Sequence, residues 1–183
     1  MGSKEEAIAL YLLGVAHGGL TKAVYDELND VQKTMVGEMR ENGRLSYTLH
    51  SDVRSLFIVA LTGGVFDIIH PGHVNTLNEA KKQADVLVVV VATDATVRKK
   101  KEREPLHTQE ERAELAGALK PVDLAIVGAS DWKATLMRVS PDLVVYGYDQ
   151  TPMDISGVRT LQLSTRVEKP NSKTSAVRDK LGL

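Results

Sequence analysis

Two histidines, at positions 70 and 73, stand in a glycine-containing stretch whose residue types suit the handling of phosphate groups. The stretch reads Thr62-Gly63-Gly64-Val65-Phe66-Asp67-Ile68-Ile69-His70-Pro71-Gly72-His73. Glycines let a backbone approach a ligand closely, and the free N–H groups at a helix start favour an anion. Imidazole N–H groups there can donate to the oxygens that gain charge when a phosphate attacks the α-phosphorus of a nucleoside triphosphate. Such a transfer depends on positioning and needs no nucleophile from the protein.

The two histidines also have simpler interpretations. They can form a capping or partly buried pair, which is the commoner role of a single histidine. They can be zinc ligands, although no third ligand lies nearby and the chain has no cysteine. The stretch is not a Walker loop, because no Gly-Lys-Ser/Thr follows, and it lacks the third spaced glycine of the dinucleotide fingerprint. Asp67 is interpreted as structural support, because a carboxylate beside the reacting phosphates would repel them.

A basic run at residues 98–103 has the sequence RKKKER, with five positive charges in six residues. Its simplest interpretation is a solvated loop. Because the run follows the second predicted strand, it falls on the same edge of the sheet as the histidines, where a triphosphate and an acceptor phosphate would meet.

After residue 54, valine-rich apolar runs alternate with helical periodicity, which predicts a doubly wound parallel α/β sheet. The predicted strands cover residues 56–61, 86–92, 124–128, 143–146 and 158–163. The predicted helices cover residues 72–84, 108–119, 131–139 and 173–181. Ligands bind beyond the carboxyl ends of strands in such a sheet, and the histidine stretch follows its first strand.

Residues 1–54 form a second predicted unit, so the expected domains are 1–54 and 55–183. Helical spacing predicts three short helices, the third built on Val31, Met35 and Met39 and stopped by Asn42-Gly43, followed by a strand at 44–49. This order resembles a winged helix-turn-helix. The segment holds six Lys or Arg against eight Asp or Glu, which weakens the case for binding DNA.

Composition narrows the class of protein further. The chain has 183 residues and a net charge of -1, so it lacks the global positive field of a dedicated nucleic-acid binder. Its longest apolar run, residues 86–92, falls short of the roughly 20 residues that a membrane helix needs. With no cysteine and no export signal in residues 1–6, we expect a soluble cytoplasmic protein.

The motif His70-Pro71-Gly72-His73 resembles the signature of the His-x-Gly-His nucleotidyltransferase superfamily, which includes cytidylyltransferases and archaeal FAD synthetases. The resemblance covers residues 56–150 and extends faintly to residue 178. Further segments are most similar to the archaeal FMN adenylyltransferase group: Lys99-Lys100-Lys101, Gln109-Glu110-Glu111-Arg112, Ala118-Leu119-Lys120-Pro121-Val122-Asp123 and Gly147-Tyr148-Asp149-Gln150. Tyr148-Asp149-Gln150 replaces the Asp-Asp-Trp-like continuation of glycerol-phosphate cytidylyltransferases.

The resemblance implies roles for named residues. Those implied in catalysis are His70, His73 and Lys101. Those implied in nucleotide binding are Thr62, Gly63, Gly64, Phe66, His70, His73, Gly147, Asp149, Thr174 and Ser175. The implied contacts to an acceptor phosphate are Arg103, Arg112 and Lys120. For Arg112 and Lys120 a salt bridge on a helix surface is the alternative, and for Thr174 and Ser175 a helix cap.

We therefore expect a nucleotidyltransferase that uses a nucleoside triphosphate and a phosphomonoester, first of all ATP and FMN. CTP with glycerol 3-phosphate or another small alcohol phosphate is the alternative within this class. Magnesium is expected, held mainly by the substrate phosphates and not by a protein metal site. The resemblance also implies a homodimer. A regulator of transcription that senses a nucleotide is the alternative of another class.

Overall fold

A computed structural model describes residues 2–41, 44–129, 131–164 and 174–182 of the chain. The chain divides into two compact units, Met1–Ile58 and Val59–Leu183. The histidine motif and the basic run both belong to the second unit.

The second unit contains a five-stranded parallel sheet with the strand order β5-β4-β3-β6-β7. The strands are β3 (Val59–Gly64), β4 (Val86–Val91), β5 (Leu124–Val127), β6 (Leu143–Tyr146) and β7 (Arg159–Gln162). All six residues of β4 are buried, as a central strand covered on both faces requires. The predicted doubly wound parallel sheet is confirmed. The first strand begins at Val59 and not at Leu56, because its pairing with β4 starts at Val59 opposite Val86.

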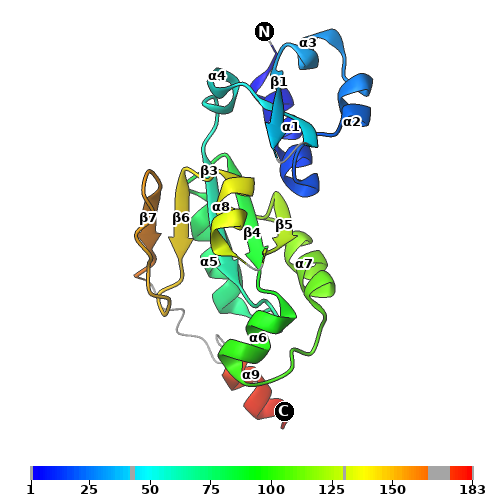
Figure 1. Ribbon diagram of the computed structural model, residues 1–183. Helices are drawn as coiled ribbons and strands as arrows, with labels where there is room; N and C mark the ends of the chain where they lie inside the picture. The colour runs from blue at the N-terminus through cyan, green and yellow to red at the C-terminus, as the bar shows by residue number, and fades with distance from the viewer. Residues whose placement is uncertain (1, 42–43, 130, 165–173, 183) are drawn as a thin grey trace. The chain divides into compact units, whose positions relative to one another are not determined.

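Helices cover both faces of this sheet and the carboxyl ends of its strands (Figure 1). They are α5 (Pro71–Lys81), α6 (Asp94–Lys101), α7 (Gln109–Gly117), α8 (Trp132–Val139) and α9 (Thr174–Leu181). Since parallel crossovers are right-handed, α5 and α7 lie on one face and α8 on the other. In Figure 1, α6 and α9 lie beyond the carboxyl ends of the strands.

The prediction of a loop for the basic run is wrong for residues 98–101, which form the second half of α6. The helix starts at Thr93, whose hydroxyl accepts a hydrogen bond from Thr96 N, and ends at Glu102, with φ +52°. Lysine and arginine are good helix formers, so a cap in front of them is enough to continue the helix.

At the opposite, amino-terminal edge of the sheet, two carboxylates close the ends of strands. Asp142 accepts a hydrogen bond from Val59 N at 2.7 Å, and Asp123 accepts one from Leu87 N at 2.7 Å. Lys81 pairs with Asp123 at 2.5 Å. These charged groups stabilise the sheet far from its carboxyl edge.

Among its described residues, the first unit contains four helices and one antiparallel hairpin. They are α1 (Lys4–His17), α2 (Lys22–Glu27), α3 (Asp30–Lys33), β1 (Val36–Glu41), β2 (Arg44–Leu49) and α4 (Ser51–Arg54). Leu20 forms an isolated bridge to Tyr47 of β2, and the ring of Tyr47 stacks on Tyr25 of α2 at 4.0 Å. An edge-on contact of Tyr11 and Phe57, at 5.4 Å, completes this small core.

The predicted third helix over Val31, Met35 and Met39 is wrong beyond Lys33. The chain turns there and enters β1, which pairs with β2 from Val36 opposite Leu49 to Glu41 opposite Arg44. Gly37 disfavours a helix, and Asn42-Gly43 is a hairpin sequence as much as a helix stop. With only four residues, α3 is short for the recognition helix of a helix-turn-helix, which further weakens the alternative of DNA binding.

No helix in the described part of the chain combines the length and the apolar character needed to cross a membrane.

Candidate active site

The loops that follow β3 and β6 define the candidate site. These strands are neighbours in the sheet, and the chain leaves β3 toward β4 on one side and β6 toward β7 on the other. Such a reversal of direction is the usual ligand position in an open parallel sheet. The loop after β3 carries the histidines, and the loop after β6 carries Gly147 and Asp149.

His70 caps the N-terminus of α5. Its Nδ1 accepts a hydrogen bond from His73 N at 3.3 Å, so in the neutral ring the proton lies on Nε2, which is left to donate. Pro71, with its fixed φ, occupies the start of the helix. Partial burial lowers the pKa of His70, and the carboxylate of Asp149 opposes this effect.

His73 lies one turn into α5, with its ring stacked on that of His70 at 3.8 Å and 17°. The Phe66 ring contacts it from another side at 4.8 Å. Burial, with a further contribution from His70, lowers the pKa of His73 to about 4. Its Nδ1 is buried without a hydrogen-bond partner among the described residues. At neutral pH the pair therefore presents neutral imidazoles that can donate hydrogen bonds to an anion without carrying a charge of their own.

The depressed pKa of His73 predicts how stability depends on pH. Between pH 6.5 and about 4 the unfolded chain protonates this histidine and the folded chain does not, so the free energy of unfolding falls as pH falls. Above pH 6.5 this histidine costs the folded chain no stability. Across the interval, the free energy of unfolding falls by at most about 3 kcal/mol. Urea unfolding at pH 7.0 and pH 4.5 measures the loss. We expect His73→Gln to lose less stability over this interval than the wild type, whereas equal losses would contradict the assignment.

Asp67 fastens the histidine loop to the segment between α6 and α7. The carboxylate accepts hydrogen bonds from Leu106 N at 2.7 Å, His107 N at 3.3 Å and Arg103 Nη1 at 2.8 Å. Burial alone would raise the pKa of Asp67, but Arg103 and the two backbone N–H groups hold it below its ordinary value. Asp67 is therefore a buried, ionised structural group.

Phe66 and Gly64 shape the turn under the histidines. Phe66 adopts a left-handed backbone conformation with φ +53°, and its side chain is 3% exposed. A Cβ on Gly64 would lie 2.8 Å from the Phe66 ring, so only glycine fits there. The side chains of two residues expected to contact the nucleotide have partners inside the protein. The ring of Phe66 supports His73 from below, and the buried Thr62 hydroxyl donates to Val145 O at 2.9 Å.

Arg112 has a different place from the one expected. Its side chain is fully buried, and its guanidinium donates to the carbonyls of Val65 at 2.6 Å, Ala92 at 2.8 Å and His107 at 3.1 Å. It also pairs with Asp94 at 2.6 Å. These partners satisfy the guanidinium, so the expectation that Arg112 binds an acceptor phosphate is corrected, as is the alternative of a surface salt bridge.

Lys120, another expected contact to the acceptor phosphate, also lies elsewhere. It follows α7 and precedes β5, which puts it at the amino-terminal edge of the sheet, opposite the histidines. Helix α7 runs from one edge to the other, so only its first turn lies near the site. The prediction that Lys120 contacts an acceptor phosphate is therefore corrected.

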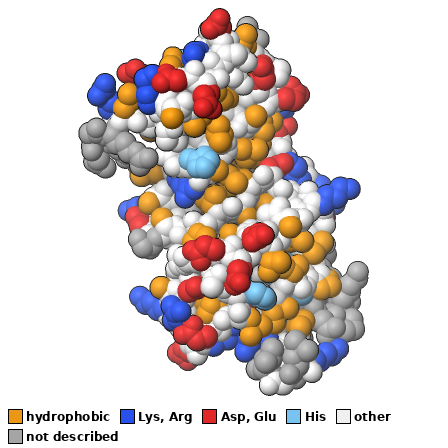
Figure 2. All heavy atoms as spheres, turned by 90° about the vertical axis from the view of Figure 1, so that its right-hand side faces the viewer, with side chains coloured by type: hydrophobic (Ala, Val, Ile, Leu, Met, Phe, Trp, Pro, Cys, Tyr) orange, Lys and Arg blue, Asp and Glu red, His pale blue; other side chains and the backbone are white. Residues whose placement is uncertain are grey.

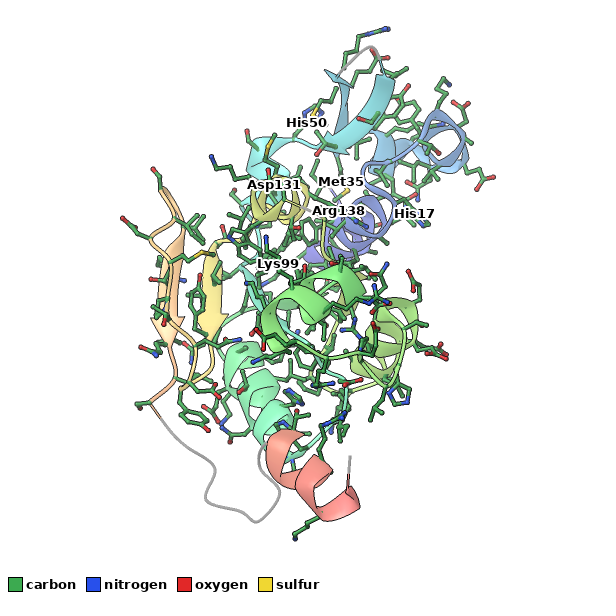
Figure 3. The ribbon with its side chains drawn as sticks, turned by 60° about the horizontal axis from the view of Figure 1, so that its bottom comes forward. His17, Met35, His50, Lys99, Asp131 and Arg138 are labelled. Carbon is green, nitrogen blue, oxygen red and sulfur yellow. The ribbon has the colours of Figure 1, made fainter. Side chains whose placement is uncertain are left out.

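The remaining basic residues stay at the carboxyl edge. Lys101 is exposed at the end of α6, and Figure 3 shows Lys99 on the same helix. Arg98 pairs with Glu104 at 2.8 Å. Arg103 keeps 26% of its side chain exposed while it binds Asp67. Fewer Lys and Arg side chains of the run 98–103 are thus available to bind a phosphate than the sequence indicated, because Arg98 and Arg103 pair with carboxylates.

The last expected contacts lie in α9. Thr174 begins this helix and is half-buried, whereas the side chain of Ser175 and all of Lys173 lie outside the described residues.

A surface hollow of about 330 Å³ lies along α7 and is lined by His107, Glu111, Glu114, Leu115 and Ala118. On this side of the molecule, Figure 2 shows acidic side chains among hydrophobic ones. Two glutamates make the hollow a poor site for a triphosphate, so it does not compete with the histidine edge.

A parallel α/β sheet with a histidine-capped helix at its switch point is the architecture of a nucleotide-binding domain whose donors can act on phosphates. Residues 61–174 match the cytidylyltransferase-like family, and the chain belongs to that family. Residues 1–60 lie outside the match.

Two curated relatives share about half of this chain. The FAD synthase of Methanopyrus kandleri is 55% identical over 94 residues, which are 49% of this chain and 62% of that protein. The FAD synthase of Thermococcus onnurineus is 47% identical over 96 residues, 51% of this chain and 63% of that protein. The chain thus spans less than two thirds of the length of these relatives.

Among solved structures, the lipopolysaccharide core biosynthesis protein of Thermoplasma volcanium has a TM-score of 0.56 and 37% sequence identity to this chain. The match covers 60% of this chain and 98% of that one. It confirms the α/β fold of the nucleotidyltransferase part.

Proposed function

We propose that this chain transfers the adenylyl group of ATP to the phosphate of FMN, forming FAD and releasing pyrophosphate. The observation that carries the proposal is the 55% identity to a protein named as an FAD synthase, over a region within a nucleotidyltransferase family match. The substitution of Tyr148-Asp149-Gln150 for the Asp-Asp-Trp-like sequence of cytidylyltransferases also favours a base other than cytosine.

In this reaction an oxygen of the acceptor phosphate attacks the α-phosphorus of the triphosphate. A new P–O bond forms as the bond from the α-phosphorus to the bridging oxygen breaks, and pyrophosphate leaves with that electron pair. The role of the protein is to hold both substrates in line and to stabilise the charge that develops. His70 Nε2–H and the N-terminus of α5 supply donors for those oxygens, and the depressed pKa of each histidine keeps the rings neutral.

Magnesium fits this proposal as a group that enters with the nucleotide. Among the described residues no cluster of three His, Cys, Asp or Glu side chains can hold a metal ion. Asp67 is occupied by Arg103 and two N–H groups. The phosphate oxygens would therefore be its main ligands, and the metal would neutralise charge on the departing pyrophosphate.

The proposal predicts direct transfer without a covalent enzyme intermediate. His70 Nδ1 accepts from His73 N, so in the neutral ring Nε2 carries the proton and suits hydrogen-bond donation, not attack on phosphorus. We expect inversion of configuration at an α-phosphorothioate stereocentre. Retention, or a trapped nucleotidyl-enzyme, would contradict direct transfer.

Lys101 is proposed to bind a substrate phosphate from the end of α6. We expect Lys101→Ala to raise the KM for a phosphate-bearing substrate by roughly 3- to 10-fold, because a charge at the edge of the site is partly screened by solvent. Lys82→Ala is the matched control, since Lys82 is an exposed helix-end lysine at the amino-terminal edge, paired with Glu79. Equal, small changes in both variants would make the end of α6 an ordinary solvated surface.

Pyrophosphate release tests the proposed substrates. Each of ATP and CTP is combined with FMN or with glycerol 3-phosphate, with magnesium present in every reaction. The proposal predicts the highest kcat/KM for ATP with FMN. Preference for CTP with glycerol 3-phosphate would replace it with a cytidylyltransferase reaction, and no release in any combination would contradict nucleotidyl transfer.

The homodimer stays a prediction from the family resemblance. Size-exclusion chromatography with light scattering on the full chain measures it, and a monomer at micromolar concentration would contradict it.

A further inference from the structure

The side chain of Gln150 joins the loop after β6 to the end of β3. Its Nε2 donates to Gly63 O at 3.0 Å, and its Oε1 accepts from Gly147 N at 2.8 Å. Its own backbone N–H donates to Gly147 O at 3.1 Å, which closes a tight turn. Each polar atom of the amide therefore has a partner inside the protein, and the two bonds together fix the orientation of the side chain.

The position of this contact in the sheet gives it a structural meaning. Backbone pairing between β3 and β6 runs from Ala60 opposite Leu143 to Thr62 opposite Val145 and ends there. The Gln150 amide adds a contact to Gly63, one residue further along β3. It thus holds the ends of β3 and β6 together just beyond their last backbone pair. A ligand bound where the chain direction reverses between these two strands would contact their ends.

A second glutamine holds the same loop from its other side. Gln162, the last residue of β7, donates from Nε2 to Gln150 O at 2.7 Å and to Tyr148 O at 3.4 Å. Two amide side chains therefore fix the loop 147–150 between β3 and β7. The exposed residue of this loop is Asp149.

We propose that Gln150 is a positioning residue, which holds the loop after β6 against Gly63 and so fixes where Asp149 lies, at the edge of the sheet that carries the catalytic His70. The catalytic role of His70 in this inference rests on the proposed function, whereas the hydrogen bonds of Gln150 do not depend on it. A neutral amide suits the task because it donates to one carbonyl and accepts from one N–H at the same time, which a carboxylate or a hydrocarbon cannot do.

The charge of Asp149 makes the loop position measurable. Its carboxylate raises the pKa of His70 against the effect of burial, whereas His73 is the other titratable group in contact with that ring. A loop that moves away would remove the contribution of Asp149 and lower the pKa of His70. This readout needs neither substrate nor turnover.

NMR titration of the His70 ring in the full chain tests the proposal with four variants. Asp149→Asn removes the charge, and Gln150→Met removes both hydrogen bonds at nearly constant volume. The double variant combines them, and Gln83→Met is the control, an exposed glutamine after α5 at the other edge of the sheet. We expect Asp149→Asn and Gln150→Met each to lower the pKa of His70, the double variant to lower it no further than Asp149→Asn, and the control to leave it unchanged.

Several results would overturn the proposal. An unchanged pKa in Gln150→Met would show that Gln150 does not hold the loop, and an unchanged pKa in Asp149→Asn would show that the carboxylate is not beside His70. If Gln150→Met does not fold, Gln162→Ala replaces it. That variant must lower the same pKa in part, and no change there would also count against the proposal.

Calorimetry with a non-hydrolysable ATP analogue separates this inference from the proposed function. We expect Gln150→Met to weaken binding about tenfold, because the loop must then be ordered by the ligand. Wild-type affinity in this variant would overturn the positioning role. A wild type that binds no nucleotide, with the NMR result intact, would contradict the proposed function and leave the loop geometry standing.

Discussion

Replacing His70 or His73 with alanine is expected to lower kcat by a factor on the order of 10² or more, because each removes a donor aimed at charge that develops in the transition state. His70 presents Nε2–H, since its Nδ1 accepts from His73 N. His73 is the ring against which His70 stacks, at 3.8 Å. Steady-state kinetics of pyrophosphate release measure the loss, with circular dichroism to show that each variant is folded.

His17→Ala is the matched control for these variants. His17 is an exposed histidine at the end of α1 in the first unit, labelled in Figure 3. It should leave kcat unchanged. His73→Gln keeps a neutral polar side chain of similar length, so it separates loss of a donor from collapse of the packing against Phe66. Near-normal turnover in either His70→Ala or His73→Ala would contradict the catalytic assignment of the histidine pair.

Arg112→Met is expected to lower the free energy of unfolding of the second unit by about 3–5 kcal/mol, because it leaves buried partners of a charge unpaired. Those partners come from four separate segments: Val65 after β3, Ala92 after β4, Asp94 at the start of α6 and His107 before α7. Methionine fills much of the space but donates to none of them. Urea unfolding followed by the fluorescence of Trp132, the single tryptophan of the chain, reports on this unit.

Arg98→Met gives the comparison, because Arg98 is an exposed arginine of α6 whose partner Glu104 is exposed as well. It should leave the unfolding midpoint unchanged. If Arg112→Met were as stable as the wild type but bound the acceptor phosphate weakly, the original expectation of a phosphate contact would be restored.

Much of the fold of the second unit could be predicted from the sequence. Short, valine-rich apolar runs predict strands covered on both faces, and all six residues of β4 are buried. The third predicted helix failed because Val31, Met35 and Met39 have helical spacing by coincidence, whereas pairing with β2 decides the structure of β1. Strand pairing depends on a partner, which spacing within one segment does not reveal.

The site was only partly predictable for a similar reason. The histidine pair is a local motif, and the structure places it at the expected edge of the sheet. Arg112 and Gln150 bond to residues far away in sequence, Val65 and Gly63 among them. A charged residue on a predicted helix is normally solvated, so burial of Arg112 had no signal within its own segment. Asp67 carried such a signal, because a carboxylate close to reacting phosphates needs a structural partner.

Identification of the reaction products tests whether this chain forms FAD from ATP and FMN. The full chain is incubated with ATP, FMN and magnesium. The flavin product is separated, identified and quantified by mass spectrometry, and pyrophosphate is measured in the same sample. We expect FAD and pyrophosphate in equal amounts, and loss of both in the His70→Ala variant. Consumption of ATP without FAD, or equal FAD formation by His70→Ala, would contradict it.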